Sequence, residues 1–91
     1  MNMKVQSLTR AFDIVELLST EQHGMALTEI ADRLSLPQST VYRLLSSLKE
    51  RGYVEQTERS GRYRLGFTFV QMSSLYLNRF ELRTEAEPPM R

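Results

Sequence analysis

The sequence predicts a mainly α-helical domain that carries a small antiparallel β-hairpin, and three features support this prediction. Apolar residues recur at helical spacing in three successive segments, of which the last two are separated by a tight turn. Two short alternating runs follow, joined by a segment that ends in glycine, which is typical of a hairpin. A further apolar helix is expected after the hairpin.

The first helix is expected from Ser7 to about Thr20, with Ser7 as its N-cap. Ile14 and Leu17 widen its apolar stripe beyond what one neighbouring helix would cover. Two explanations stay open: the helix lies across both other helices in a three-helix core, or part of the stripe contacts another subunit. The stripe itself consists of Leu8, Ala11, Phe12, Val15 and Leu18.

Residues 27–45 read as two short helices joined by a turn. A helix start is expected at Thr28, and a second one where Pro37 occupies a first-turn position that needs no N–H. Residues 25–27 are compatible with a short strand that enters the first of these helices. The arrangement is that of a helix-turn-helix, which makes duplex DNA the leading partner.

The core-facing residues of the second helix leave a polar face exposed. Val41, Leu44, Leu45 and Leu48 form one apolar stripe and are expected to point inward. An ordinary solvated helix would carry glutamate and lysine on the other face, whereas arginine and glutamine bond bidentately to guanine and adenine edges. The face is therefore expected to enter the major groove. Its middle consists of Ser39, Arg43 and Ser46, and its flanks of Gln38, Thr40, Tyr42 and Ser47.

The charge of the chain is unevenly distributed. The net charge is only +1, but residues 1–32 hold two basic and five acidic residues (−3), and residues 33–66 hold seven basic and three acidic ones (+4). Phosphate contacts supply most of the non-specific affinity of DNA-binding proteins, so a local basic surface favours this partner. Domains that bind nothing also show such asymmetries.

A hairpin is expected directly after the second helix of the motif. That helix ends near Arg51, and Gly52 is placed to close it in a left-handed conformation. Residues 53–56 and 62–65 form the two strands. Tyr63 and Leu65 share one face and Arg62 and Arg64 the other, so the hairpin resembles the wing of a winged helix-turn-helix. We expect Thr28 to hold the DNA backbone, and Arg59 at the tip and Arg62 to hold the backbone or probe the minor groove. The alternative is that the arginines keep the edge strands in solution.

Several functions are disfavoured by composition. Ninety-one residues suffice for one small domain without a large catalytic cleft, and the absence of cysteine excludes a disulfide framework and a zinc finger. His23 is expected in a surface turn, and no histidine pairs with a nucleophile, so we expect no enzyme, no metal and no cofactor. No signal peptide or membrane span is apparent, which makes a cytoplasmic protein the default.

The last helix is expected over residues 68–83, ahead of a boundary at Pro88-Pro89. It is too apolar to stand alone in water, which predicts a docking partner or a second copy of the chain. The alternative is that it folds back on Phe12 and Ile14. Its stripe consists of Phe69, Met72, Tyr76 and Phe80, flanked by Val70 and Leu77.

Taken together, these segments resemble the N-terminal winged helix-turn-helix of IclR-type bacterial transcriptional regulators. The resemblance covers about residues 5–66 and is much more specific in combination than in any one motif. Its motifs are QSLTRA at 6–11, LTEIA at 27–31, LPQSTVYRLL at 36–45, GYV at 52–54 and GRYRLG at 61–66.

The resemblance implies a repressor-type regulator that binds a (pseudo)palindromic promoter site as a homodimer or homotetramer. It also implies a small-molecule effector that is bound by a separate domain. Residues 1–66 would be the DNA-binding domain and residues 67–91 a linker helix that helps to hold DNA-binding domains together. The chain would then be an isolated N-terminal fragment or a naturally short protein. A winged-helix module that docks on other proteins is the alternative.

Two positions depart from the family pattern. Ser35 stands in the turn where members often have glycine, which makes a left-handed residue there less favourable. Gln38 stands where members often have lysine, which removes one phosphate contact and adds an amide able to read a base.

Overall fold

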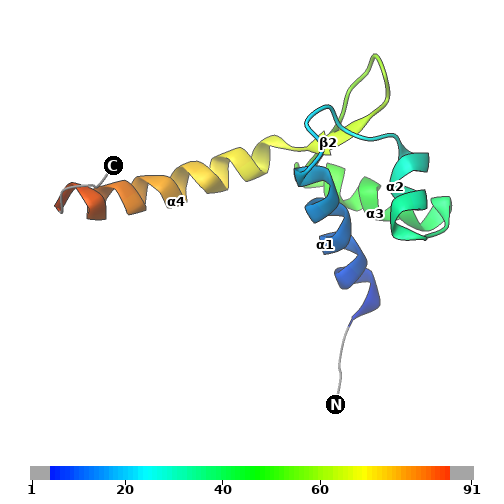
Figure 1. Ribbon diagram of the computed structural model, residues 1–91, viewed down its shortest axis with the longest axis horizontal. Helices are drawn as coiled ribbons and strands as arrows, with labels where there is room; N and C mark the ends of the chain where they lie inside the picture. The colour runs from blue at the N-terminus through cyan, green and yellow to red at the C-terminus, as the bar shows by residue number, and fades with distance from the viewer. Residues whose placement is uncertain (1–4, 87–91) are drawn as a thin grey trace.

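The structure, a computed structural model, describes residues 5–86, with side chains described through residue 79. Helices α1 to α3 pack together, a two-stranded hairpin closes them on one side, and α4 projects away from this body (Figure 1). This is the mainly α winged helix-turn-helix that the sequence predicts. The elements are α1 Gln6–Ser19, α2 Leu27–Leu34, α3 Gln38–Glu50, β1 Val54–Gln56, β2 Tyr63–Leu65 and α4 Phe67–Ala86.

All three helices of the body and both strands contribute to one hydrophobic core. No polar or charged residue other than the Tyr63 phenol belongs to it within the described residues. Full burial of an aliphatic side chain stabilises a fold by about 1.5–3 kcal/mol, so this core sets how each helix is rotated. The core residues are Ile14, Leu18, Met25, Ile30, Ala31, Val41, Leu45, Val54 and Tyr63.

Helix α1 lies against both α2 and α3, as the first explanation expects, but it buries only part of its wide apolar stripe. Ile14 is fully buried and Leu17 packs against the core, whereas Leu8 and Phe12 remain more than half exposed. The helix has two adjacent apolar faces, and periodicity alone does not say which one a single copy of the chain buries. Of the expected stripe, Leu18 is buried in the core, whereas Leu8 and Phe12 lie outside it.

The expected starts of α1 and α2 were displaced. Helix α1 begins at Gln6, so Ser7 lies in its first turn and is not the N-cap. Helix α2 begins at Leu27, one residue before Thr28. Its start is held by the Glu29 carboxylate, which accepts a hydrogen bond from the Ala26 N–H at 2.9 Å. A carboxylate in the first turn also suits the helix dipole.

The turn between α2 and α3 keeps a left-handed residue although it is serine. Ser35 has a φ of 56°, and the Leu36 N–H donates to the Ala31 carbonyl at 2.9 Å, which closes the end of α2 as a Schellman motif. Pro37 then occupies the cap position directly before α3 begins at Gln38, so it removes no helical hydrogen bond.

The hairpin is tied to the loop between α1 and α2. Strands β1 and β2 are antiparallel, with Val54 opposite Leu65. On the other edge of β2, the Met25 N–H donates to the Tyr63 carbonyl at 2.8 Å and the Tyr63 N–H donates to the Met25 carbonyl at 2.7 Å. The short strand expected at 25–27 is thus a single β-bridge at Met25.

The hairpin, the end of α3 and the start of α4 meet at two glycines. Gly52 has a φ of +83°, as expected for the residue that closes α3. The Gly66 N–H donates to the Tyr53 carbonyl at 2.8 Å, and a Cβ on Gly66 would collide with the Gly52 carbonyl oxygen. The chain therefore enters α4 through a close backbone contact that only glycine allows at position 66.

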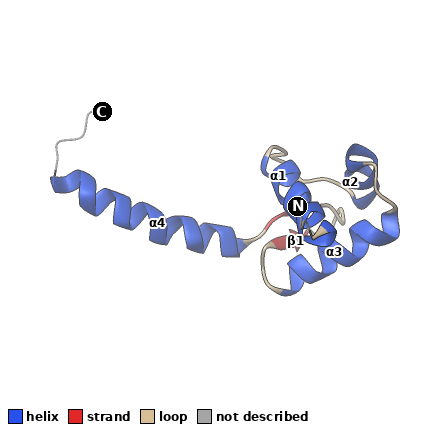
Figure 2. Cartoon of the chain, turned by 90° about the horizontal axis from the view of Figure 1, so that it is seen from below, coloured by secondary structure: helices blue, strands red, loops and turns tan. Residues whose placement is uncertain are grey.

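Helix α4 extends away from α1–α3, as Figure 2 shows. Its first turn lies near α1, since Phe69 and Met72 line one groove together with Phe12. The alternative that α4 folds back on Phe12 and Ile14 is therefore met only in part, because the start of α4 reaches Phe12, whereas Ile14 does not line this groove. The boundary expected at Pro88-Pro89 lies outside the described residues. Among the helices described, none is long and apolar enough to cross a membrane.

Candidate nucleic-acid interface

The rotation of α3 is fixed by its buried face. Val41 and Leu45 are fully buried, and Leu44 and Leu48 pack against the core, as predicted. Because these four side chains cannot turn outward without emptying the core, the residues on the opposite side are held outward. The reading face proposed from the sequence is thus a real surface of the molecule.

This surface is polar and has no acid near its centre. The sole carboxylate in α3 is Glu50, in its last turn. Tyr42 is 57% exposed, and Thr40 is half-buried at the flank that faces α1. We call this surface the polar face of α3: Gln38, Ser39, Thr40, Tyr42, Arg43 and Ser46, of which all but Thr40 are exposed.

Arg43 lies at the middle of the polar face without an internal partner. Within the described residues its guanidinium makes no hydrogen bond and no ion pair. An arginine that is exposed and not engaged by its own chain keeps its five donors available to a ligand. Thr28 is likewise exposed, in the first turn of α2.

The tip of the wing is braced by hydroxyl groups. The Thr57 and Ser60 hydroxyls share a hydrogen bond of 2.7 Å, and the Gly61 N–H donates to the Thr57 carbonyl at 2.8 Å. Gly61 has a φ of +74°, as a tight turn demands. Arg59 stands exposed on this braced turn and makes no ion pair within the part of the chain described.

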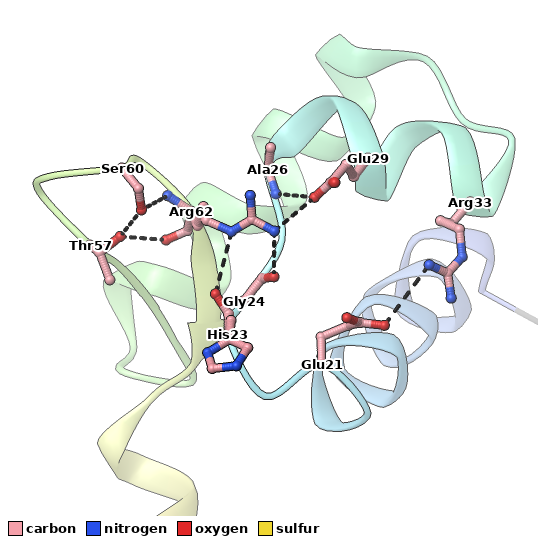
Figure 3. Close-up of polar contacts among 9 residues, drawn as sticks. All are labelled: Glu21, His23, Gly24, Ala26, Glu29, Arg33, Thr57, Ser60 and Arg62. Atoms are coloured by element: carbon pink, nitrogen blue, oxygen red, sulfur yellow. Dashed lines mark hydrogen bonds and ion pairs between the residues drawn. The ribbon is translucent and has the colours of Figure 1, made fainter.

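Arg62 behaves differently from Arg59, because its side chain is bound to its own domain (Figure 3). Its Nη2 donates to the Gly24 carbonyl at 3.0 Å and pairs with the Glu29 carboxylate at 3.3 Å, and its Nε donates to the His23 carbonyl at 3.4 Å. The arginine therefore joins the wing to the α1–α2 loop and to the start of α2. Sequence reasoning missed this contact, because no sequence signal joins Arg62 to a loop 38 residues away.

Arg64, the second basic residue of the strand, is also paired. Its Nε lies 3.3 Å from one oxygen of the Glu55 carboxylate, on the neighbouring strand. The other oxygen of Glu55 accepts a hydrogen bond from the Phe67 N–H at 3.0 Å, at the first residue of α4. Glu55 thus links the wing to the start of α4, a role that sequence reasoning missed.

An apolar groove lies between α1 and the start of α4. Its volume is about 340 Å³, and almost all of its wall is carbon. The rings of Tyr53 and Phe69 pack against each other in it at a tilt of 60°, with their centroids 5.2 Å apart. The expected stripe of α4 is divided: Phe69 and Met72 line this groove, Tyr76 is 67% exposed farther along, and the side chain of Phe80 lies outside those described. The remaining walls come from Leu8, Ala11, Phe12, Val15, Leu48 and Tyr53.

The described residues contain no cluster of histidine and acidic side chains that could hold a metal ion. Tyr63 is the one group whose titration is clearly perturbed there: burial, and secondarily the nearby Tyr42, raises the pKa of its phenol above 10.0. The place of this phenol in the hydrophobic core explains the shift.

A helix-turn-helix whose second helix carries an exposed polar face without an acid, followed by a basic wing, defines the class of winged helix-turn-helix proteins. Residues 7–58 match the family described as the IclR helix-turn-helix domain, and the chain belongs to that family. The expectation drawn from the sequence motifs is confirmed.

Individual relatives are transcriptional regulators by name. The chain is 37% identical over 86 residues to the glycerol operon regulatory protein of Streptomyces coelicolor, covering 94% of this chain and 34% of that protein. It is 33% identical over 88 residues to the transcriptional repressor IclR of Escherichia coli, covering 97% and 32%. Among solved structures, the IclR of Thermotoga maritima superimposes with a TM-score of 0.74 at 27% identity, covering 86% of this chain and 31% of that one. The chain thus spans about a third of the length of the curated relatives it matches.

Proposed function

We propose that the chain binds duplex DNA through α3, laid in the major groove. The observation that supports this proposal is the polar face of α3, which is held outward by buried residues and carries an unengaged arginine at its centre. Ser39, Arg43 and Ser46 are proposed to reach base edges, where arginine bonds bidentately to guanine. Gln38, Thr40 and Tyr42 are proposed to contact bases or phosphates at the flanks.

The wing and the start of α2 are proposed to hold the DNA backbone. Arg59 is the best placed of these residues, because it is exposed at a braced turn and has no ion pair with the part of the chain that the structure describes. Thr28 is exposed in the first turn of a helix, where N–H groups and a hydroxyl favour a phosphate. Arg62 is also proposed to contact the DNA backbone. Three interactions of its side chain are made within the domain, so we propose that it acts mainly by fixing the position of the wing.

We further propose that residues 1–66 act as the DNA-binding domain of a bacterial transcriptional regulator and residues 67–91 as its linker. The supporting observation is that relatives about three times as long as this chain are named as operon regulators and repressors. A small-molecule effector bound by another domain and a place in the cytoplasm, where bacterial DNA lies, belong to the same proposal. No enzymatic step is proposed.

A homodimer on a (pseudo)palindromic site is the assembly that we propose. The apolar groove with Phe12 and Phe69, and the exposed apolar residues of α4, offer a surface that a second copy would cover. Analytical ultracentrifugation of the chain should show a reversible dimer. Phe12→Ser should shift it toward monomer, because a serine removes the aromatic wall of the groove. A strict monomer for both proteins would exclude this surface as sufficient for dimerisation.

The DNA proposal is tested by selecting duplexes bound by the chain from a random pool, and by measuring affinity for the selected duplex against salt concentration. We expect one enriched motif and a steep loss of affinity as salt rises. Arg43→Ala should lose the motif, while the matched control Arg79→Ala, on exposed α4, should keep it. No enrichment together with salt-insensitive binding would favour a module that docks on proteins.

A further inference from the structure

A second basic surface lies beside the polar face of α3, in a cleft between α3 and the first half of α1. Two of its lining residues, Ser7 and Arg10, come from α1, and these are one helical turn apart on the same side of that helix. The cleft has a volume of about 370 Å³, against about 30 Å³ for the share of one water in the liquid. Its α3 wall consists of Thr40, Arg43, Leu44 and Ser47.

The charge of the cleft is uncompensated. Two guanidinium groups and three hydroxyl groups line it, and no carboxylate does. Within the described residues, neither Arg10 nor Arg43 makes an ion pair or a hydrogen bond, although Arg10 is half-buried. Three other arginines of the domain, Arg33, Arg62 and Arg64, are each paired with a glutamate, whereas Arg59 at the tip of the wing has no ion pair within the described residues. Two cations that share a cleft with only hydroxyl groups repel each other until an anion enters.

The position of the cleft relative to the polar face identifies the anion. Thr40 and Ser47 form the flank of α3 that faces α1, and Arg43, which is three or four residues from each of them at the middle of the polar face, also lines the cleft. A helix is about 10–12 Å across and the major groove about 12 Å wide, so a helix in the groove brings its flanks against the sugar-phosphate backbone. Arg10 stands on that flank.

We infer that this cleft is a binding site for a backbone phosphate of the DNA duplex, with Arg10 as a DNA-contacting residue supplied by α1. Ser7 and Ser47 donate to the same phosphate oxygens, and Arg43 is thereby left to turn toward a base edge. The inference rests on the proposed function and adds to it a contact that lies outside the helix-turn-helix and the wing. A phosphate contact carries no sequence information, so this site fixes how α3 sits in the groove.

The test compares Arg10→Gln with the matched control Arg79→Gln, in the 91-residue chain, on a duplex of arbitrary sequence and on the duplex selected from the pool. Arg10→Gln should lose about tenfold in affinity, the usual effect of one hydrogen-bonded charge. The loss should be equal on both duplexes, and the slope of log affinity against log salt should fall by about 0.9, the value for one phosphate. Arg10→Lys should recover most of the affinity, because lysine binds phosphate as a point charge.

A second pair of variants guards against a folding defect in Arg10→Gln. Ser47→Glu places a carboxylate in the cleft and should weaken binding at least as much, whereas Ser74→Glu on exposed α4 should not. Thermal unfolding should be unchanged for Arg10→Gln, because the side chain makes no hydrogen bond or ion pair with the described residues.

The outcomes separate the two proposals. If the unmodified chain binds both duplexes with a steep salt dependence and Arg10→Gln matches Arg79→Gln in affinity and slope, the phosphate site is refuted and the DNA-binding function stands. If Arg10→Gln loses affinity on the selected duplex alone, Arg10 reads a base and the phosphate assignment is wrong. If the unmodified chain binds no duplex, the function itself is refuted, and the site with it.

Discussion

A substitution of Arg62 separates the stability of the fold from DNA affinity most clearly. Replacing it with methionine keeps most of the aliphatic stem and removes all three interactions of the guanidinium. The bond to the Gly24 carbonyl is short, at 3.0 Å, while that to the His23 carbonyl is long and the Glu29 pair is half exposed. With about 1 kcal/mol for the first, a few tenths for the second and 0.2–1 kcal/mol for the exposed pair, Arg62→Met should cost about 1–2 kcal/mol.

For a domain of this size, that loss should lower the Tm by about 5–15 °C in a thermal melt followed by circular dichroism. Arg59→Met is the matched control, because Arg59 lies on the same hairpin, is exposed and makes no ion pair in the described part of the chain. Its free energy of unfolding should change by no more than about 0.5 kcal/mol, as for an ordinary surface substitution, so its Tm should shift less than that of Arg62→Met. For DNA binding the order of the two variants should reverse. Arg59→Met should lose more affinity than Arg62→Met, although its fold is as stable as that of the unmodified chain. Equal melting of the two variants would refute the reasoning.

Three further predictions concern the hairpin and its joint with α4. Because burial raises the pKa of Tyr63, the folded chain holds the phenolic proton more tightly than the unfolded one, so stability should fall as pH rises above about 10, and Tyr63→Phe should lose less in alkaline denaturation; an identical alkaline loss in both would contradict this. Gly66→Ala should destabilise by about 1–3 kcal/mol in urea unfolding, since its Cβ would strike the Gly52 carbonyl; an unchanged urea midpoint would show that the contact can relax. Glu55→Ala should speed amide exchange at Phe67 by about five- to tenfold through loss of one hydrogen bond; unchanged exchange would mean that Glu55 does not hold α4.

The orientation of α3 was predictable from the sequence because its apolar residues form one stripe. Val41 and Leu45 repeat at helical spacing, and no other face of that helix is apolar enough to compete for the core. Once this stripe is buried, the polar residues on the opposite side of α3 must be exposed. Gly52 and Gly61 were also predictable, because the turns at the end of α3 and in the hairpin require a positive φ.

The orientation of α1 was not predictable on the same grounds. Its Leu8–Phe12 side and its Ile14–Leu18 side are both apolar, and the choice depends on how α2 and the hairpin pack. The extra apolar side is left at the groove with α4. Ser35 shows a similar limit, since the Schellman bond from Leu36 to Ala31 holds a left-handed serine that local preference disfavours.

The engagement of the wing arginines depends on contacts between segments far apart in the sequence. Arg62 reaches the Gly24 carbonyl because the Met25 bridge brings the α1–α2 loop against β2. An alternating strand pattern says which arginines share a face, but it does not say what lies opposite that face. Arg10 was missed as a site residue for the same reason, since the cleft exists only where α1 crosses α3.

The central claim is that Arg43 reads sequence from the middle of the polar face of α3. The most direct test is to measure the affinity of the chain and of Arg43→Ala for the selected duplex and for every single base-pair change in it. The unmodified chain should discriminate by about 1–3 kcal/mol at one base pair per half-site, and Arg43→Ala should lose that discrimination while keeping it at other positions. An unchanged discrimination profile in Arg43→Ala would contradict the claim.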